Sequence, residues 1–317
     1  MTPAQNLSEL DQGAASPKGA APWPLAGVSK KLFTHASVVL SVVFLSIVVL
    51  MAIFAPFITK LSGWGPFTFD SSAIDAASGG LPKGDFGGIS ARHWFGVEPQ
   101  SGRDIFARIV YGAQVSMLIA ISATLVTAFL GIVLGMLAGF FRGAADQIIS
   151  RIMDFLMAFP TLIFMIALLS ALPHVNRPLM LVTVLGIFGW THMGRIIRSQ
   201  TMSLAQREFV EAAHASGARR ATIVFREILP NLTGTIIVIA TLAVPTFIGI
   251  EAGLSFLGVG ITPPTASWGQ MIASSVPWFT VVPTYFLIPG MFLFFTVLSF
   301  TVLGDQLQKI IAGGGRS

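Results

Sequence analysis

The chain has 317 residues, of which 54% are hydrophobic and only 10% are charged, and its mean hydropathy is +0.79. Soluble domains carry about 25% charged residues, so this composition excludes a soluble globular protein and indicates a single integral membrane domain. Without Cys the chain has no disulfide, thiol redox site or thiolate metal site, and its net charge of +5 does not indicate a nucleic-acid partner, because most of the excess lies where the positive-inside rule places it.

The N-terminal segment, residues 1–30, is rich in Ala, Pro, Gly and Ser and has no periodic apolar face. We expect it to be a disordered cytoplasmic tail. It does not resemble a cleavable signal peptide, because the first apolar run begins only near Phe33 and is too long. We expect the membrane domain to cover residues 31–310 and a cytoplasmic tail to cover 311–317.

Six apolar stretches are long enough to cross the bilayer, which takes roughly 20 residues for about 30 Å of hydrocarbon. They are 33–58, 114–140, 155–173, 179–198, 232–257 and 284–304. The third is the weakest because Pro160 interrupts its first turns, although neighbouring helices can satisfy the carbonyl that a proline frees. The predicted fold class is an all-α integral membrane protein with six transmembrane helices.

The distribution of Lys and Arg predicts that both termini are cytoplasmic. With the N-terminus inside, 13 of the 19 basic residues fall in cytoplasmic segments and 6 in extracytoplasmic ones. The inside residues are Lys18, Lys30, Lys31, Arg142, Arg151, Arg195, Arg198, Arg207, Arg219, Arg220, Arg226, Lys309 and Arg316, and the outside residues are Lys60, Lys83, Arg92, Arg103, Arg108 and Arg177. This orientation creates an extracytoplasmic loop over 59–113 and a cytoplasmic loop over 199–231.

Within the second stretch, Gly131, Gly135 and Gly139 form a doubled G-x-x-x-G pattern. Helices in lipid associate mainly by close packing, which small residues permit. We therefore favour a tight helix–helix seam over a pore-lining role for these glycines.

Motifs for enzyme chemistry are missing from the sequence. It contains no G-x-x-x-x-G-K-[ST] phosphate loop, no H-E-x-x-H zinc motif and no G-x-S-x-G elbow. The histidines are scattered, at His35, His93, His174, His192 and His214. We expect no catalytic site, no metal site and no cofactor bound by this chain.

Glu251 is the one candidate for an acidic residue within a predicted span, and its position indicates that it lies near the outer boundary. A carrier driven by an ion gradient usually keeps ionisable groups at membrane depth, so their scarcity argues against a self-contained proton carrier. We favour a structural role for Glu251, either capping the following loop or pairing with a neighbouring subunit, over binding of substrate.

The polar stretch EFVEAAHASGARRATIVFREILPN, residues 208–231, contrasts with the apolar sequence around it. Two short helices are predicted, because apolar or small residues recur at helical spacing in each half. These residues are Phe209, Ala212, Ala213 and Ser216 in the first helix, and Ala221, Val224, Phe225 and Ile228 in the second. Gly217 suits the turn between them, and Pro230 suits the first turn of the next helix.

Three Arg balance three Glu in this stretch, which is unlike a polybasic lipid-binding patch. Short helices with Ala faces and mixed charges at the rim suit the groove of a protein partner. A solvated cytoplasmic loop is the competing interpretation.

Three motifs resemble a known family. Glu211-Ala212-Ala213, Gly217 and Leu229-Pro230 resemble the EAA loop of ABC-importer permeases, which docks on a separate ATPase subunit. The stretches EAGLSFLGVGITPPTASWGQMI (251–272) and HWFGVEPQSGRDIFARIVYGAQVS (93–116) are similar to segments of the peptide and nickel branch. The resemblance covers about residues 93–305 and the first spanning helix, and it points to the C-type inner-membrane permease of dipeptide and oligopeptide importers.

The sequence departs from the family pattern at three places. Glu227 stands where the broad motif favours Ile, as is common in the peptide branch. Val97-Glu98 replaces Thr-Asp, and the outer loop over 59–92 is longer than usual. The last two differences concern how the outer region meets its binding protein.

The resemblance implies a multi-pass permease of the bacterial inner membrane with the type I importer fold. Its implied partners are a second, homologous permease, two ATPase subunits that use ATP and Mg, an extracytoplasmic binding protein and membrane lipid. The residues implied in ATPase coupling are Glu211, Ala212, Ala213, Gly217, Leu229 and Pro230, with Glu211 making a polar contact at the docking edge.

Candidate residues of an outer loop or gate are Arg103, Asp104, Glu251, Pro263, Pro264, Trp268 and Gly269. For Arg103 and Asp104 we favour a local ion pair that locks the outer loop over contact with the binding protein. Trp268 and Trp278 are expected in an aromatic belt at the outer interface. Pro263, Pro264 and Gly269 are expected to stiffen an outer or re-entrant loop.

Three alternatives remain at this stage. A nickel importer shares the motifs of this permease branch. An ion-coupled carrier or channel would move its substrate without ATPase partners, and a scaffold would bind a cytoplasmic protein without transport.

Overall fold

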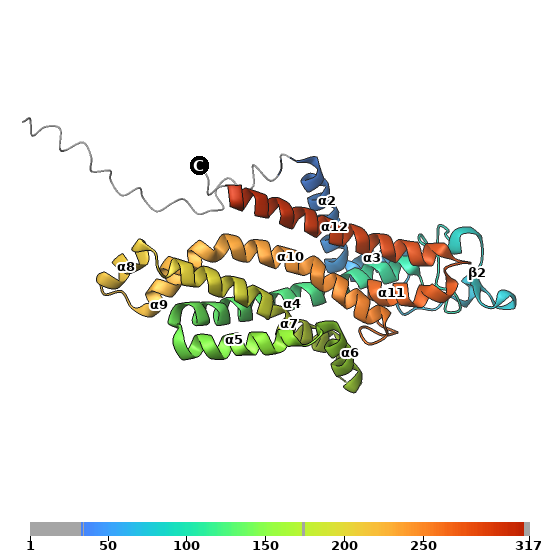
Figure 1. Cartoon of the computed structure of the whole chain (residues 1–317). Coiled ribbons are helices and arrows are strands. Elements are labelled where there is room, and N and C mark those ends of the chain that lie inside the picture. Colours follow the sequence, from blue (N-terminus) through green and yellow to red (C-terminus); the bar gives the residue numbers. More distant parts are fainter. Residues whose placement is uncertain (1–32, 34, 173–174, 314–317) are drawn as a thin grey trace, which may run out of the picture.

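The described part of the chain is mainly helical, with a small irregular layer at one end (Figure 1). The computed structural model describes residues 33, 35–172 and 175–313, so the tail expected over 1–30 lies outside the described residues. The long and short α-helices are α2 (Ala36–Ile53), α3 (Ala55–Ser62), α4 (Ile105–Phe141), α5 (Gly143–Ala158), α6 (Thr161–Ala171), α7 (Arg177–Leu204), α8 (Glu208–Ala215), α9 (Arg220–Thr222), α10 (Leu229–Phe256), α11 (Trp268–Ser275) and α12 (Pro283–Gly313).

The irregular layer lies between α3 and α4. It contains the 3-10 turns η2 (Ser71–Ala73), η3 (Ala76–Ser78) and η4 (Asp85–Gly87) and the two-residue strands β1 (Ile74–Asp75) and β2 (Leu81–Pro82). The strands pair antiparallel, with Ile74 opposite Pro82. A further 3-10 turn, η6 (Val276–Trp278), leads from α11 to α12. The long predicted outer loop is therefore a folded layer.

Five helical stretches of the described chain are long and apolar enough to cross a membrane, and a sixth candidate is the bent pair α5–α6. The prediction of a single helix over 155–173 is wrong in form, because α5 ends at Ala158, α6 begins at Thr161, and the two axes meet at 83°. Pro160 lacks an N–H and disfavours helical geometry in the residue before it, and Phe159 is indeed extended.

The second span begins earlier than the apolar run that predicted it. Its helix, α4, starts at Ile105 and has 37 residues. At about 1.5 Å per residue this helix is longer than the roughly 30 Å of hydrocarbon. The first turns of α4 therefore extend into the irregular layer, where Asp104 caps the helix by accepting a hydrogen bond from the Ala107 N–H (2.7 Å).

The predicted glycine seam is confirmed between α4 and α7. A Cβ added at Gly135 would lie 2.7 Å from the carbonyl oxygen of Gly194, and one at Gly139 would lie 2.6 Å from that of Arg198. A Cβ added at Gly131 would lie 3.0 Å from the side chain of Met193 and 3.2 Å from the backbone nitrogen of Gly194. The two helices therefore approach to backbone contact along three turns.

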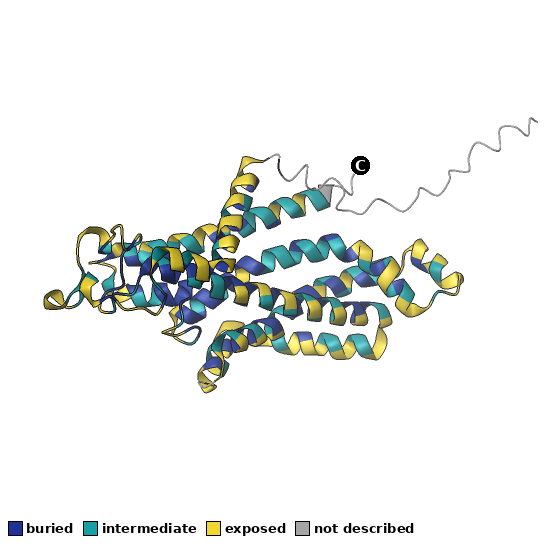
Figure 2. Ribbon diagram, turned by 180° about the vertical axis from the view of Figure 1, so that it is seen from behind, coloured by how far each residue is buried: buried dark blue, intermediate teal, exposed yellow. Residues whose placement is uncertain are grey.

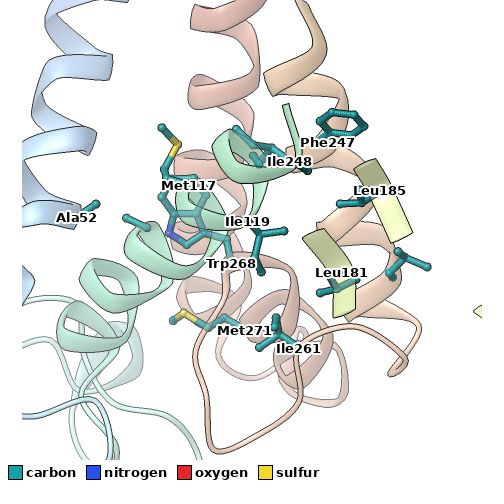
Figure 3. Packing of buried hydrophobic residues seen from close by; sticks show 14 of the residues in the cluster. Ala52, Met117, Ile119, Leu181, Leu185, Phe247, Ile248, Ile261, Trp268 and Met271 are labelled. Atoms are coloured by element: carbon teal, nitrogen blue, oxygen red, sulfur yellow. The ribbon is translucent and has the colours of Figure 1, made fainter. Parts of the chain in front are cut away.

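Buried side chains form two clusters. The larger one surrounds Trp268, which lies among Met117, Ile119 and Met271 in Figure 3, and it joins α4, α7, α10 and α11. The smaller one, here called the inner cluster, consists of Met136, Met193, Ile197, Val210, Ile223, Ile228 and Leu232. It joins α4 and α7 to α8 and the start of α10.

The seam makes a prediction about stability. Gly135→Ala is expected to destabilise the folded protein by about 1–3 kcal/mol, because the added methyl group meets backbone that cannot move aside. Gly249→Ala on α10 is the matched control, since its Cβ would enter open space. Thermal unfolding of the two purified variants in detergent measures the difference. Equal melting temperatures would refute the close backbone contact of α4 and α7 at Gly135.

Candidate functional site

The inner ridge, defined as residues 208–228, projects from one end of the molecule and is largely exposed (Figures 1 and 2). Val210 anchors α8, because its side chain is fully buried in the inner cluster together with those of Ile223 and Ile228. Because the same cluster includes side chains of α4 and α7, the ridge is packed onto the ends of two membrane helices.

Gly217 ends α8 in the way predicted from the sequence. Its φ is +76°, the left-handed region that favours glycine. The Ala218 N–H donates to the Ala213 carbonyl (3.0 Å) and the Gly217 N–H donates to that of His214 (3.0 Å). This pair of bonds is a Schellman motif, and Ala213 and Ala218 supply its apolar contact against the inner cluster. The turn is therefore fixed by bonds within the ridge itself.

The exposed face of the ridge carries small and polar side chains together with the aromatic ring of Phe225, which is 63% exposed. Glu211, Ala212 and Ser216 are exposed, Ala213 is half-buried, and Phe209 is 38% exposed. Glu211 also lines a hollow of about 370 Å³ between α8 and the ends of α4 and α7. The structure thus places four of the six residues predicted for coupling (Glu211, Ala212, Ala213 and Gly217) on the inner ridge, whereas Leu229 and Pro230 begin α10.

The second predicted short helix is not separate from the span that follows it. After α9, residues Ile223–Ile228 form a π-helical turn that runs directly into α10. The Leu229 N–H donates to the carbonyl of Val224, five residues back. Pro230 lies in the first turn of α10, as predicted, and the preceding π turn accommodates its missing N–H. The ridge is therefore continuous with α10, without an intervening loop.

The opposite end of the molecule contains a buried ion-pair network, here called the outer clasp: Glu98, Arg103, Arg108 and Tyr285. The Glu98 carboxylate is 1% exposed and lies 2.7 Å from Arg103 Nε and 2.6 Å from Arg108 Nε. The Tyr285 hydroxyl donates to Glu98 Oε1 (3.0 Å), the same oxygen that faces Arg108. Two guanidinium groups and a phenol thus compensate one buried carboxylate.

Arg108 extends the outer clasp to the segment after α10. Its guanidinium donates to the carbonyls of Pro66 (3.2 Å) and Pro264 (3.1 Å) and to Gln270 Oε1 (2.7 Å). The irregular layer, the loop 257–267 and α11 are therefore tied to one side chain of α4. Sequence reasoning assigned Arg108 only to the outside of the membrane and missed this role.

A second cluster beside the clasp fixes the start of α4. Asp104 Oδ2 lies 2.9 Å from His93 Nδ1, and His93 Nε2 lies 3.2 Å from Asp70 Oδ2. Burial raises the pKa of Asp104, whereas a hydrogen bond from the Ser72 hydroxyl lowers the pKa of Asp70. Asp104 therefore contacts His93 and the helix end, while its neighbour Arg103 pairs with Glu98. The two residues lock the outer loop through separate partners and not through each other.

Glu251 is fully buried near the outer end of α10. The hydroxyls of Ser116 on α4 (3.0 Å) and Ser255 on α10 (2.7 Å) donate to its carboxylate. Ser255 Oγ in turn accepts a hydrogen bond from the Ile261 N–H (2.9 Å). This arrangement places Glu251 inside the chain, where it braces the following loop and is enclosed from a neighbouring subunit.

The expectation that Trp268 belongs to an aromatic belt is wrong. Its side chain is fully buried, and its Nε1 donates to the Ile109 carbonyl (3.2 Å), so it packs against the start of α4 instead of lipid. Trp278 on η6 is half-buried. Gly269 permits α11 to contact the backbone of α10 at Ala252. Pro263 and Pro264 lie in the loop 257–267, which the outer clasp holds through the Pro264 carbonyl.

Comparisons with known proteins match the chain over most of its length. Residues 131–314 match the family described as binding-protein-dependent transport system inner membrane component. The oligopeptide transport system permease protein OppC of Bacillus subtilis is 36% identical over 84% of this chain and 81% of its own. The dipeptide transport system permease protein DppC of Alkalihalophilus pseudofirmus is 35% identical over 92% of this chain and 89% of its own.

Two further similarities extend this pattern. The glutathione transport system permease protein GsiD of Pectobacterium atrosepticum is 37% identical over 71% of this chain and 73% of its own. Among solved structures, a chain of the inward-facing MetNI methionine ABC transporter superposes with a TM-score of 0.51. The superposition covers 64% of this chain and 96% of the transporter chain, with 18% sequence identity. This similarity shows a shared fold.

The outer clasp makes a prediction about stability. Arg108→Met is expected to destabilise the protein by about 3–5 kcal/mol, because it leaves the Glu98 carboxylate buried with less compensation. Adding Glu98→Gln to that variant should recover part of the loss. Arg92→Met is the control, because its side chain is 71% exposed and the pair with Asp70 is long (3.8 Å), so the change should be below about 1 kcal/mol. Thermal unfolding in detergent measures all three, and equal effects of Arg108→Met and Arg92→Met would contradict the clasp.

Proposed function

The chain belongs to the inner-membrane components of binding-protein-dependent transport systems, and from that premise we propose that it forms, with a second and homologous permease, the path by which di- and oligopeptides cross the bacterial inner membrane. It is a multi-pass permease of the inner membrane with the fold of type I ABC importers. As a permease subunit it is not an enzyme; ATP hydrolysis takes place on separate subunits.

The names of the relatives favour peptide cargo over nickel. OppC, DppC and GsiD are named for oligopeptides, dipeptides and glutathione, respectively. A self-contained carrier and a scaffold are likewise disfavoured, because these relatives are subunits of transport systems. The binding protein that delivers the peptide would supply much of the selectivity for its length and side chains.

The inner ridge is the proposed docking site for the ATPase subunits, which use ATP and Mg. The observation that carries this assignment is its geometry: a projecting and largely exposed element, with Glu211 and Ala212 outward and Val210 anchored in the inner cluster. When the ATPase pair closes on ATP, a push on α8 reaches α4, α7 and α10 through that cluster. The spanning helices would then rock between inward-open and outward-open arrangements, each with its own contacts to the ATPases.

This assignment orients the chain in the membrane. The ridge end with residues 199–231 is cytoplasmic, together with both termini, and the end with the outer clasp and residues 59–113 is extracytoplasmic. The binding protein would meet the irregular layer there. Pro263, Pro264 and Gly269 would belong to an outer gate, braced by Glu251 and by the clasp through Arg108.

The turn of the ridge makes the first functional prediction. Gly217→Leu is expected to insert into the membrane normally but to uncouple ATP hydrolysis from peptide uptake. A left-handed φ costs a leucine about 1–2 kcal/mol, so the turn is strained although the space around it is open. Gly217→Asn is the matched control, because Asn tolerates this conformation and should retain coupling. The ratio of peptide taken up to ATP hydrolysed in reconstituted vesicles measures the effect, and full transport by Gly217→Leu would remove the assignment of this loop.

Glu211 tests the docking contact directly. Glu211→Arg reverses a charge on the exposed face of the ridge and is expected to reduce co-purification of the ATPase subunits with the permease. Asp85→Arg makes the same change on an exposed residue of the opposite end and should leave recovery of the ATPases unchanged. Equal recovery of ATPase subunits with both variants would count against a charged contact at Glu211.

A further inference from the structure

A cavity of about 440 Å³ lies in the membrane-spanning part of the chain, where the break between α5 and α6 faces α7 and α10. We call it the midplane cavity. His192 is near the middle of α7, Thr246 is near the middle of α10, and Thr127 is near the middle of α4, so the cavity lies well inside the span. Neither Asp, Glu, Lys nor Arg occurs among its described lining residues.

Thr127 supplies an unused hydrogen-bonding group to this cavity. Its side chain is only 2% exposed, yet its hydroxyl has no hydrogen-bond partner in the described part of the chain. Most other threonine hydroxyls in these helices bond to a carbonyl of the preceding turn, as Thr124 does to Ala120 (2.8 Å) and Thr246 to Leu242 (3.0 Å), although Thr201 on α7 does not. A buried hydroxyl without a partner costs about 1–3 kcal/mol. A ligand with a polar group would remove this penalty.

The break at Pro160 brings a second set of unused donors to the same place. The first N–H groups of a helix have no partner within it, and no side chain caps α6 within the described chain. Met157 and Thr161, on the two sides of the break, both line the midplane cavity. The starts of interrupted membrane helices bind anionic groups of substrates in this way. The first turn of α6 is therefore suited to a carboxylate.

His192 and three methionines also line the cavity. An imidazole at membrane depth is unfavourable unless it serves a polar path, and it can both donate and accept hydrogen bonds. Met157, Met165 and Met193 provide a flexible apolar wall that adapts to different shapes. The polar groups thus match features common to all peptides, whereas the apolar wall tolerates variable side chains.

We propose that the midplane cavity is the peptide-reading part of the path in this chain. Thr127 and His192 bind main-chain amide groups of the passing peptide, the first turn of α6 takes its terminal carboxylate, and the methionines pack against its side chains. This inference rests on the proposed function, since it assigns residues to the peptide path. It requires that transport depends on the peptide backbone and its C-terminus within this chain, in addition to any selection by the binding protein.

The carboxylate contact is tested in vesicles that contain both permeases, the ATPases and the binding protein. The measured quantity is the ratio of uptake rates for a tripeptide and its C-terminal amide, normalised to assembled complex. Thr161→Pro removes one N–H from the first position of α6, where proline is tolerated. This variant should show a ratio about tenfold lower than that of the unmodified complex. Thr161→Val keeps that N–H and should keep the ratio. Because every variant uses one binding protein, its own preference cancels.

The main-chain contacts are tested in the same vesicles. Thr127→Val, which preserves the shape of the side chain, and His192→Leu should each lower the uptake rate of the tripeptide about tenfold, the loss of roughly one hydrogen bond. Gly249→Ala on α10, outside the cavity lining, should leave uptake unchanged.

Access of water to the cavity is tested by thiol labelling, which is simple because the chain contains no Cys. A water-soluble thiol reagent should label Thr246→Cys, and transported peptide should slow that labelling. Ile187→Cys is the control, because Ile187 is exposed on α7 but does not line the cavity, so its thiol should face lipid and stay unlabelled.

The outcomes separate this inference from the proposed function. If the unmodified complex takes up no peptide, the proposed function fails and the inference fails with it. If that complex takes up peptide while Thr127→Val, His192→Leu and Thr161→Pro behave like it, only the cavity inference is overturned. A Thr246→Cys protein that stays unlabelled in an active complex also overturns it, because lipid or a partner helix then fills the cavity.

Discussion

Close backbone contact between α4 and α7 is the constraint on which the rest of the fold depends. Lipid gives two helices little hydrophobic reason to associate, so the absence of side chains at Gly135 and Gly139 is what permits dense packing between them. Both buried clusters are built around this pair, one towards each end. The outer clasp begins from Arg108 at the start of α4, and the inner ridge is anchored against Met136 near its end. One helix, α4, therefore connects the outer clasp to the inner ridge.

The long helices could be predicted from the sequence because an apolar run of sufficient length has few other solutions in a membrane. The turn at Gly217 could also be predicted, since its geometry depends on neighbouring residues only. The angle between α5 and α6 could not, because Pro160 determines that a break occurs but packing determines its direction. Continuity of α9 with α10 was missed because a π turn has no clear sequence signal.

The outer clasp shows a different limit of sequence reasoning. Arg108 reaches Pro264 and Gln270, which are 156 and 162 residues away in the chain, and no local pattern contains such a contact. A charged residue within the first turns of an apolar helix was the available signal. The prediction that Trp268 belongs to an aromatic belt was wrong for a related reason. A tryptophan near the interface can face lipid or the protein core, and the partner of its indole N–H, here the Ile109 carbonyl, is not visible in the sequence.

The Schellman turn of the inner ridge has a consequence for the energetics of association. Its hydrogen bonds and its apolar anchor are both made within this chain, so the ridge has its final shape before any partner arrives. A flexible loop would lose conformational entropy on docking, whereas this preorganised element loses little. In the docking that we propose, more of the free energy of association would therefore remain available to move the helices beneath the ridge.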